Sequence, residues 1–208
     1  MARRVILLLL SLCVAGAICA QDTAYAADSD VYIVQPGDSL WKISRKYQVG
    51  LWEVIQANPQ IKNPNLIYPG DRVTVPLLTA EKQWEAQVVQ LVNQERAKHG
   101  LRPLTANWEL ARVARIKSQD MRDRRYFSHQ SPTYGSPFEM IRAFGISFVA
   151  AGENIAAGQT SPQAVMNSWM NSPGHRQNIL NATFTEIGVG YAKGGAYGHY
   201  WTQMFIRR

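Results

Sequence analysis

The chain has 208 residues, of which 46% are hydrophobic and 18% are charged. This composition excludes a disordered or fibrous protein, and the length allows one or two domains that each bury a core. The formal net charge is +7 at pH 7.

Residues 1–26 are predicted to be a secretory signal peptide. Arg3 and Arg4 form a positive start, residues 5–20 are a long apolar run, and residues 24–26 (AYA) form a small-x-small cleavage site. The alternative is an uncleaved membrane anchor, but the run is near the lower length limit for spanning a bilayer, and the cleavage site favours removal. We therefore expect a secreted mature chain that begins near Ala27.

The cysteines and the charges indicate a compartment. Cys13 and Cys19 both lie in the predicted signal peptide, so the mature protein has no disulfide, which suits a bacterial wall better than an animal secretion.

The excess of positive charge lies in residues 84–208, with 14 basic and 8 acidic residues. Much of it is in residues 112–125, RVARIKSQDMRDRR. Outside the cytoplasm this stretch predicts contact with an anionic wall polymer or a membrane surface rather than nucleic acid, unless it is only a solvated helix face.

Residues 31–76 are predicted to form a small unit with the order strand, helix, helix, strand. Alternation in VYIV indicates a first strand, and Asp38 or Ser39 can cap a helix that runs to Lys46. A second helix fits residues 51–57, because Asn58-Pro59 would stop it. Residues 72–75 form the closing strand.

This segment resembles a LysM domain through YIVQPGDSLWKIS, IQANPQI and LIYPGDRVTVP. The resemblance implies binding of glycans that contain N-acetylglucosamine, such as peptidoglycan, in a groove between two loops. Carried over by resemblance, one side of the groove is Gly37, Asp38, Ser39 and Leu40, and the other is Asn58, Pro59, Ile61, Leu66 and Ile67. For the apolar members Leu40, Leu66 and Ile67, the alternative is a place in the core.

Residues 77–83 are predicted to be a linker, and residues 84–208 a second, larger domain. Helices come first and two strands come last, joined near Gly194-Gly195, so the fold class is α+β. Ser136 and Glu139 form a capping box at the start of one helix. Further helix starts are expected at Asn107, Ser161 and Ser172.

This second domain resembles a CAP domain, the superfamily of cysteine-rich secretory proteins, antigen 5 and pathogenesis-related proteins. The matching pieces are LVNQERAKHGLRPL, FSHQSPTYGSPFEMI, AGENIAAG, WMNSPGHRQNIL, EIGVGYA and YWTQMF, which cover about residues 86–206. The resemblance implies an α-β-α sandwich with a central cleft. The pairing of LysM and CAP domains resembles proteins of spore-forming bacteria.

In many CAP domains two histidines and two acidic residues line the cleft, and some bind a divalent metal there. By resemblance, His129 and Glu153 match the first histidine and the first acid. The second acid should follow Trp169, but no carboxylate stands there. The slot of the second histidine holds Tyr200, and His199 is one residue away. One residue along a strand is the opposite face, so His199 belongs to the cleft only if a bulge corrects the register.

His175 follows the position of the missing acid and could supply another nitrogen to the cleft. Three interpretations stay open for His129, Glu153 and His175. They form a structural or ligand-binding polar cluster, or a divalent metal site such as zinc with an open position, or a catalytic site in which Glu153 acts as a base. The first is the leading interpretation, because no dense metal-binding motif is present.

The leading hypothesis is a secreted protein of the cell wall or spore envelope. Its LysM unit would bind peptidoglycan or another N-acetylglucosamine polymer, and its CAP cleft would bind a wall polymer, lipid or protein. One alternative is a wall hydrolase centred on His129, Glu153 and His175. Another is a carrier of hydrophobic ligands.

Overall fold

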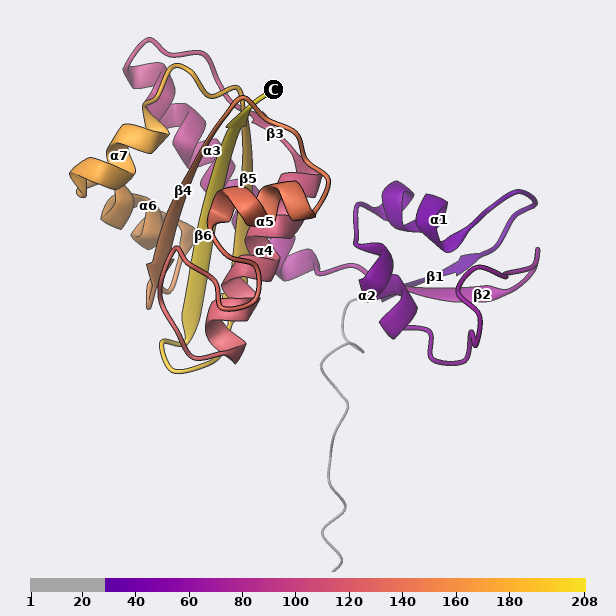
Figure 1. The fold of residues 1–208 in the computed structure, drawn as a ribbon. Coiled ribbons are helices and arrows are strands. Elements are labelled where there is room, and N and C mark those ends of the chain that lie inside the picture. The colour runs from indigo at the N-terminus through magenta and orange to yellow at the C-terminus, as the bar shows by residue number, and fades with distance from the viewer. Residues whose placement is uncertain (1–28) are drawn as a thin grey trace, which may run out of the picture.

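The computed structural model describes residues 29–208, so the predicted signal peptide at 1–26 lies outside the described residues. These residues fold into two units, which we call the N-terminal unit (residues 29–76) and the C-terminal unit (residues 79–207) (Figure 1). No helix within residues 29–208 has both the length and the apolar character needed to cross a membrane.

The N-terminal unit has the predicted order of strand, helix, helix, strand. Strands β1 and β2 pair antiparallel, and both helices pack on this two-stranded sheet over a core of seven buried apolar residues. The elements are β1 (Ser29–Ile33), α1 (Leu40–Tyr47), α2 (Leu51–Gln56) and β2 (Arg72–Pro76). The core is Val34, Leu40, Ile43, Val49, Val54, Val73 and Val75.

Ser39, and not Asp38, caps helix α1. The Ser39 hydroxyl accepts a hydrogen bond from the backbone N–H of Lys42 at 3.2 Å, which satisfies one of the unpaired amides of the first turn. The Asp38 carboxylate instead accepts from the Tyr32 hydroxyl and the Gln35 backbone N–H, both at 2.8 Å. Asp38 therefore closes the turn between β1 and α1.

The C-terminal unit contains five helices and four strands. They are α3 (Thr79–Lys98), β3 (Thr105–Ala106), α4 (Trp108–Asp123), α5 (Pro137–Ala143), β4 (Ala150–Ala157), α6 (Pro162–Met170), α7 (Pro173–Ile179), β5 (Glu186–Lys193) and β6 (His199–Arg207). The connection to the N-terminal unit is shorter than the predicted linker at 77–83, because α3 already begins at Thr79. The sequence AEKQ that follows consists of good helix formers, which extends α3 toward the N-terminal unit.

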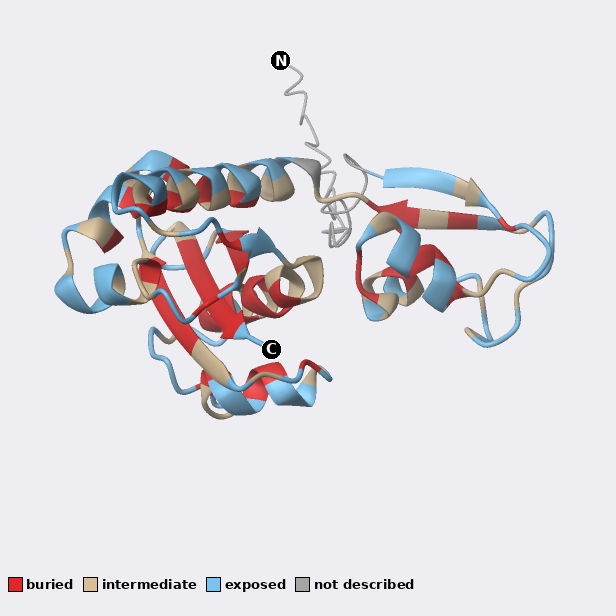
Figure 2. Ribbon diagram, turned by 90° about the horizontal axis from the view of Figure 1, so that it is seen from above, coloured by how far each residue is buried: buried red, intermediate tan, exposed pale blue. Residues whose placement is uncertain are grey.

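The four strands form one sheet in the order β3-β5-β6-β4, in which only β3 runs parallel to its neighbour. Helices α3, α6 and α7 cover one face, and α4 and α5 cover the other (Figure 1). Buried residues lie in the strands and on the inner sides of the helices (Figure 2). This α-β-α sandwich confirms the predicted fold.

The helix starts expected from the sequence are present. The side chains of Asn107, Ser136 and Ser161 accept hydrogen bonds from the first turns of α4, α5 and α6, and Glu139 completes the capping box. Strand β4 was not expected from the sequence. Its residues, AAGENIAA, are mostly small and polar, so neither alternation nor β-branched side chains mark a strand.

Helix α4 approaches strand β5 at backbone contact distance. A methyl group added at Gly188 or Gly190 would overlap the backbone of α4 at Leu110–Ala111 and Ala114–Arg115. The hydroxyl of Ser118 donates to the carbonyl of Gly190 at 3.0 Å, which ties helix to strand. The two glycines therefore set the distance between α4 and the sheet.

The basic stretch 112–125 is only partly an exposed basic surface, because its middle is packed inside the molecule while Arg124 and Arg125 at its end are exposed. Arg115 and Lys117 are buried because they face the close contact of α4 with its neighbours. Arg115 pairs with the buried Glu85 of α3, and Arg112 pairs with Glu53 of the N-terminal unit at 3.1 Å. Arg112 and Arg115 are therefore engaged within the protein and are not free to contact an anionic polymer.

The two units touch through charged groups at the end of α1, the start of α2 and the start of α4. Arg112 holds Glu53 with two hydrogen bonds, of 3.1 and 3.2 Å. Arg45 pairs with Glu109, and its guanidinium lies 5.1 Å from the ring centre of Trp108. A bidentate arginine and a cation–π contact hold the units together with defined geometry.

Replacement of Gly190 by alanine should destabilise the C-terminal unit by about 3 kcal/mol or more, because the added methyl group forces α4 away from β5. Gly174→Ala is the matched control, since nothing lies within 4 Å of its methyl position, and should change stability by less than about 1 kcal/mol. Urea unfolding followed by tryptophan fluorescence measures both. Equal stabilities of the two variants would contradict the close contact.

Candidate functional site

An open cleft of about 620 Å³ lies along the free edge of β4, the last strand of the sheet. The loop after α4 forms one wall, and helices α6 and α7 form the other. The volume is in the range of pockets that bind small ligands. The lining residues are Phe127, Ser128, His129, Gln130, Ile155, Ala156, Ala157, Gln159, Ser168, Trp169 and His175.

His129, which lines this cleft, is hydrogen-bonded to Glu153 of β4. His129 Nδ1 lies 2.7 Å from Glu153 Oε1. The histidine side chain is 55% exposed, whereas that of the glutamate is only 1% exposed. The buried acid thus fixes the orientation of an exposed imidazole, an arrangement in which the second ring nitrogen stays available to a ligand.

Burial raises the pKa of Glu153 above its ordinary value, and the hydrogen bond from His129 and the positive charge of Lys117 oppose this effect. Its second oxygen, Oε2, is buried without a hydrogen-bond partner within residues 29–208. A buried polar atom without a partner is rare in native proteins. Glu153 Oε2 can therefore accept a hydrogen bond from a ligand or a water molecule.

His175 reaches the same cleft from the start of α7. Burial lowers its pKa, and so does the nearby His129. Its Nδ1 is also buried and has no hydrogen-bond partner among the described residues. At neutral pH His175 is thus an uncharged ring with unused hydrogen-bonding capacity beside the His129–Glu153 pair.

These side chains do not fit the zinc site that the sequence suggested. Within residues 29–208, no three histidine, cysteine or acidic side chains are close enough to share a metal ion. Glu153 Oε1 is already hydrogen-bonded to His129, and His175 reaches the cleft from α7. His129 and His175 thus line one cleft, and Glu153 is connected to it through its hydrogen bond to His129.

Lys117 of α4 holds the loop that carries His129. Its ammonium group is buried and donates to the carbonyls of Ser128 at 2.8 Å and His129 at 3.0 Å. The positive charge of Lys117 also lowers the pKa of Glu153, against the effect of burial. A buried cation with such partners fixes backbone geometry, because moving the loop would leave the charge unpaired.

Asp120, one turn further along α4, anchors the rest of the same loop. Its carboxylate accepts hydrogen bonds from the hydroxyls of Tyr126 at 2.6 Å, Ser131 at 2.7 Å and Thr133 at 2.7 Å. Together these bonds lower the pKa of Asp120 against the opposing effect of burial. The loop is therefore held at both ends by a single helix.

A second polar network holds the floor of the cleft. The Asn154 amide donates to the carbonyl of His175 at 3.0 Å and to Gln203 Oε1 at 3.1 Å. Asn178 donates to the carbonyl of Glu153 at 3.2 Å and to Asn154 Oδ1 at 2.9 Å. Asn178 and Gln203 were not predicted from the sequence, although an amide within an apolar stretch such as YWTQMF was a usable signal.

His199 and Tyr200 lie outside the cleft. The pairing of β5 with β6 runs without a bulge from Lys193↔His199 onward, so His199 stays on the face of α3. There its Nδ1 lies 2.8 Å from the Tyr191 hydroxyl, and its ring stacks on Trp84. Tyr200 is fully buried in the core beside Ile155. A bulge was the condition for placing His199 in the cleft, and this pairing contains none.

Several of the expected glycan-binding side chains have structural roles instead. Leu40 lies in the core. Asn58 is buried and bridges α2 to β2, because it donates to the carbonyls of Val54 and Thr74 and accepts from the Thr74 N–H, at 2.7 to 2.8 Å. Ser39 and Asp38 serve the cap and the turn described above.

The exposed members of the expected groove are Gly37, Pro59 and Leu66, whose exposed fraction is 51% for Leu66. Ile61 and Ile67 are half-buried against the core. Tyr68 is exposed next to this group and was missed by the sequence analysis. Both loops lie at the end of the N-terminal unit that points away from the C-terminal unit (Figure 1).

Replacement of Glu153 by glutamine should change how stability depends on pH. The folded-state pKa of Glu153 is raised above 4.5, so its protonation stabilises the fold fully below pH 4.5, and this contribution is lost as pH rises through the folded pKa. Glutamine does not titrate and can still accept from His129. The free energy of unfolding of the wild type should therefore fall relative to Glu153→Gln as pH rises from 4 to 8. A difference that stays constant with pH would contradict the raised pKa.

Comparisons with known proteins agree with both units. The sequence matches the LysM domain over residues 32–76 and the CAP, cysteine-rich secretory protein family over residues 89–205. It is 58% identical over 123 residues to the uncharacterized protein YkwD of Bacillus subtilis, which covers 59% of this chain and 47% of that protein. It is 54% identical over 46 residues to SpoIVD-associated factor A of Bacillus subtilis, which covers 22% of this chain and 12% of that protein.

Among solved structures, an extracellular protein containing an SCP domain from Bacillus anthracis is 38% identical and superimposes with a TM-score of 0.57. The match covers 67% of this chain and 47% of that protein. The chain therefore spans less than half the length of these relatives. Because the match to the CAP family covers more than half of its residues, the chain belongs to the cysteine-rich secretory protein (CAP) family and carries a LysM domain ahead of its CAP domain.

Proposed function

We propose that this protein is an exported, peptidoglycan-associated binding protein of the cell wall or spore envelope. A LysM domain indicates binding to N-acetylglucosamine glycans such as peptidoglycan. The CAP cleft at the edge of β4 then binds a second component of the wall. The unpaired, buried Glu153 Oε2 beside an oriented His129 is the observation that carries the role of the cleft.

The LysM domain supports the attachment through its exposed loops. Gly37, Pro59 and Leu66 present backbone and apolar surface at the end farthest from the CAP domain (Figure 1). Apolar groups of this kind cover sugar faces, and backbone amides meet acetamido and hydroxyl groups. The glycan can therefore bind without covering the CAP cleft.

The cleft favours a polar ligand. Glu153 Oε2 needs a donor, and the neutral His175 ring offers unused hydrogen-bonding capacity. A ligand that satisfies these buried atoms gains affinity, because it removes the cost of leaving them unpaired. Phe127 and Ile155 add apolar lining. A hydroxyl-rich or amide-rich component of the wall fits this pattern.

The proposed location rests on the kinds of protein that the chain resembles. One solved relative is described as extracellular, and another relative is named SpoIVD-associated factor A. The predicted signal peptide is consistent with export.

Hydrolysis of the wall is a second candidate function, favoured by the His129–Glu153 pair. A carboxylate that orients an imidazole is the arrangement used in general base catalysis. The activated group would be a water molecule. Release of soluble fragments from peptidoglycan would identify this function.

If the LysM domain attaches the protein to peptidoglycan, the protein should sediment with purified peptidoglycan, and Leu66→Ala should weaken this binding. Losing one exposed apolar contact of this size costs about 1–2 kcal/mol, or roughly tenfold in affinity. Val149→Ala truncates an exposed apolar side chain of the CAP domain and should bind as the wild type does. Pelleting assays with quantified supernatants measure all three proteins. No sedimentation of the wild type would contradict the attachment.

A further inference from the structure

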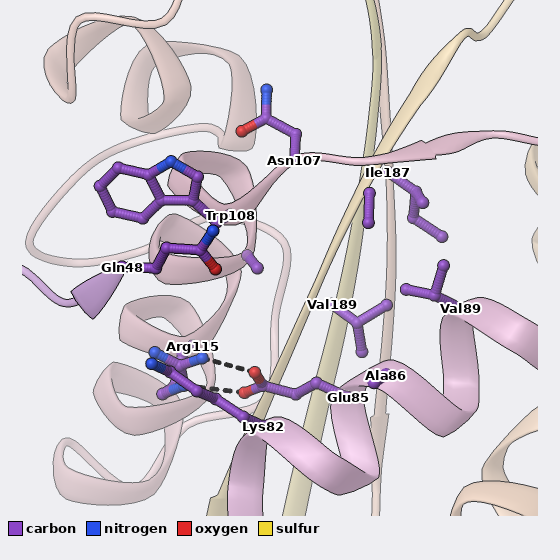
Figure 3. A pocket seen from close by; sticks show the side chains of 12 residues that line it. Gln48, Lys82, Glu85, Ala86, Val89, Asn107, Trp108, Arg115, Ile187 and Val189 are labelled. Carbon is purple, nitrogen blue, oxygen red and sulfur yellow. Dashed lines mark hydrogen bonds and ion pairs between the residues drawn. The ribbon is translucent and has the colours of Figure 1, made fainter. Parts of the chain in front are cut away.

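A second pocket, of about 400 Å³, lies at the opposite edge of the sheet, beside β5 and close to the junction of the two domains. Its floor is apolar, with Val89, Ile187 and Val189 among the lining residues. Trp108 and Asn107 stand at one end, and Lys82, Glu85 and Arg115 stand at the other (Figure 3). This pocket shares no residue with the cleft at β4.

The pocket occupies the place where β3 would have continued. Strand β3 pairs parallel to β5 through Thr105↔Glu186 and Ala106↔Ile187, and the chain then turns at Asn107 into α4. The edge of β5 beyond Ile187 is consequently left without a neighbouring strand. A short extended peptide could take the vacant position.

The backbone of β5 offers a donor inside this pocket. The N–H of Tyr191 points away from β6 and donates to Glu85 Oε1 at 3.0 Å. Because backbone groups alternate along a strand, the N–H of Val189 points to the same side. Val189 lines the pocket, so its amide faces the space that a peptide carbonyl would fill.

The charged residues at the Lys82 end of the pocket determine which terminus of a peptide would fit there. Glu85 is engaged by Arg115 and by the N–H of Tyr191. Lys82 is half-buried and has no carboxylate at ion-pair distance within residues 29–208, and its ammonium donates only to the carbonyl of Tyr47 at 3.2 Å. One cation thus remains without a counter-ion at the end toward which a strand parallel to β5 would run.

We propose that this pocket binds the carboxy terminus of a peptide with small apolar residues, extended alongside β5. Its last carbonyl would accept from the N–H of Val189, and its terminal carboxylate would pair with Lys82. The apolar floor accommodates the small side chains, and Trp108 closes the entrance side of the pocket. This site is independent of the function proposed for the β4 cleft.

The test is a titration of the ¹⁵N-labelled mature protein with N-acetyl-alanyl-alanine, followed through the backbone amide signal of Val189. The acid should shift this signal saturably. Its carboxamide should bind at least about tenfold more weakly, because a charge-assisted hydrogen bond is lost. Lys82→Met should show the same loss for the acid, and Lys82→Arg should restore binding because it keeps the charge.

Two further variants separate the site from general effects. Lys98→Met changes an exposed lysine of the same helix and should bind as the wild type does. Ala86→Phe fills the pocket from an exposed position and should abolish binding. Equal binding of acid and carboxamide, or full binding by Lys82→Met, would overturn the proposal. Tighter binding of octanoate than of the dipeptide, with the Val189 amide unshifted, would overturn it in favour of an acyl ligand.

Discussion

The contact of helix α4 with strand β5 is the constraint on which both ends of the CAP domain depend. Gly188 and Gly190 allow the helix backbone to lie directly on the strand. Along one helix, Arg112 and Arg115 then reach the LysM domain and α3, while Lys117 and Asp120 reach the loop of His129. A shift of α4 away from the sheet would disturb the domain junction and the cleft together.

The two edges of the sheet carry different chemistry. At the β4 edge, an exposed histidine is oriented by a buried acid, and Glu153 Oε2 and His175 Nδ1 are buried without a hydrogen-bond partner in the described part of the chain. At the β5 edge, a backbone amide and a lysine without a carboxylate partner within residues 29–208 border an apolar floor. The LysM loops face away from the CAP domain, so a bound glycan leaves both edges free.

Local signals made much of the fold predictable. The βααβ order was predictable from short patterns in the sequence. The caps at Ser39, Asn107 and Ser136 were predictable because these residue types form short-range hydrogen bonds at helix starts. Strand β4 could not be predicted in the same way, because its small and polar residues are stabilised by pairing with β6 and by neighbouring amides. The early start of α3 was missed because the linker was assigned from its position between two domains.

The candidate site was predicted in part. His129 and Glu153 were assigned from a family resemblance, and strand alternation made His199 a doubtful member of the cleft. The roles of Lys117 and Asp120 in holding the loop of His129 were not predicted. A run of basic residues is typical of a solvated helix face, and only the packing of α4 shows that Lys117 is buried. Asn58 was predicted to contact the glycan, but its side-chain amide donates to the backbone carbonyls of Val54 and Thr74. Only the tertiary structure reveals this structural role.

The central claim is that the CAP cleft binds a wall component rather than cleaving it. The most direct measurement incubates the mature protein with purified peptidoglycan, beside Glu153→Gln, and resolves the soluble fraction by chromatography. The account predicts that the protein stays with the pellet and that no fragments appear with either form. Fragments released by the wild type and absent with Glu153→Gln would contradict it and would establish a hydrolase with the His129–Glu153 pair at its active site.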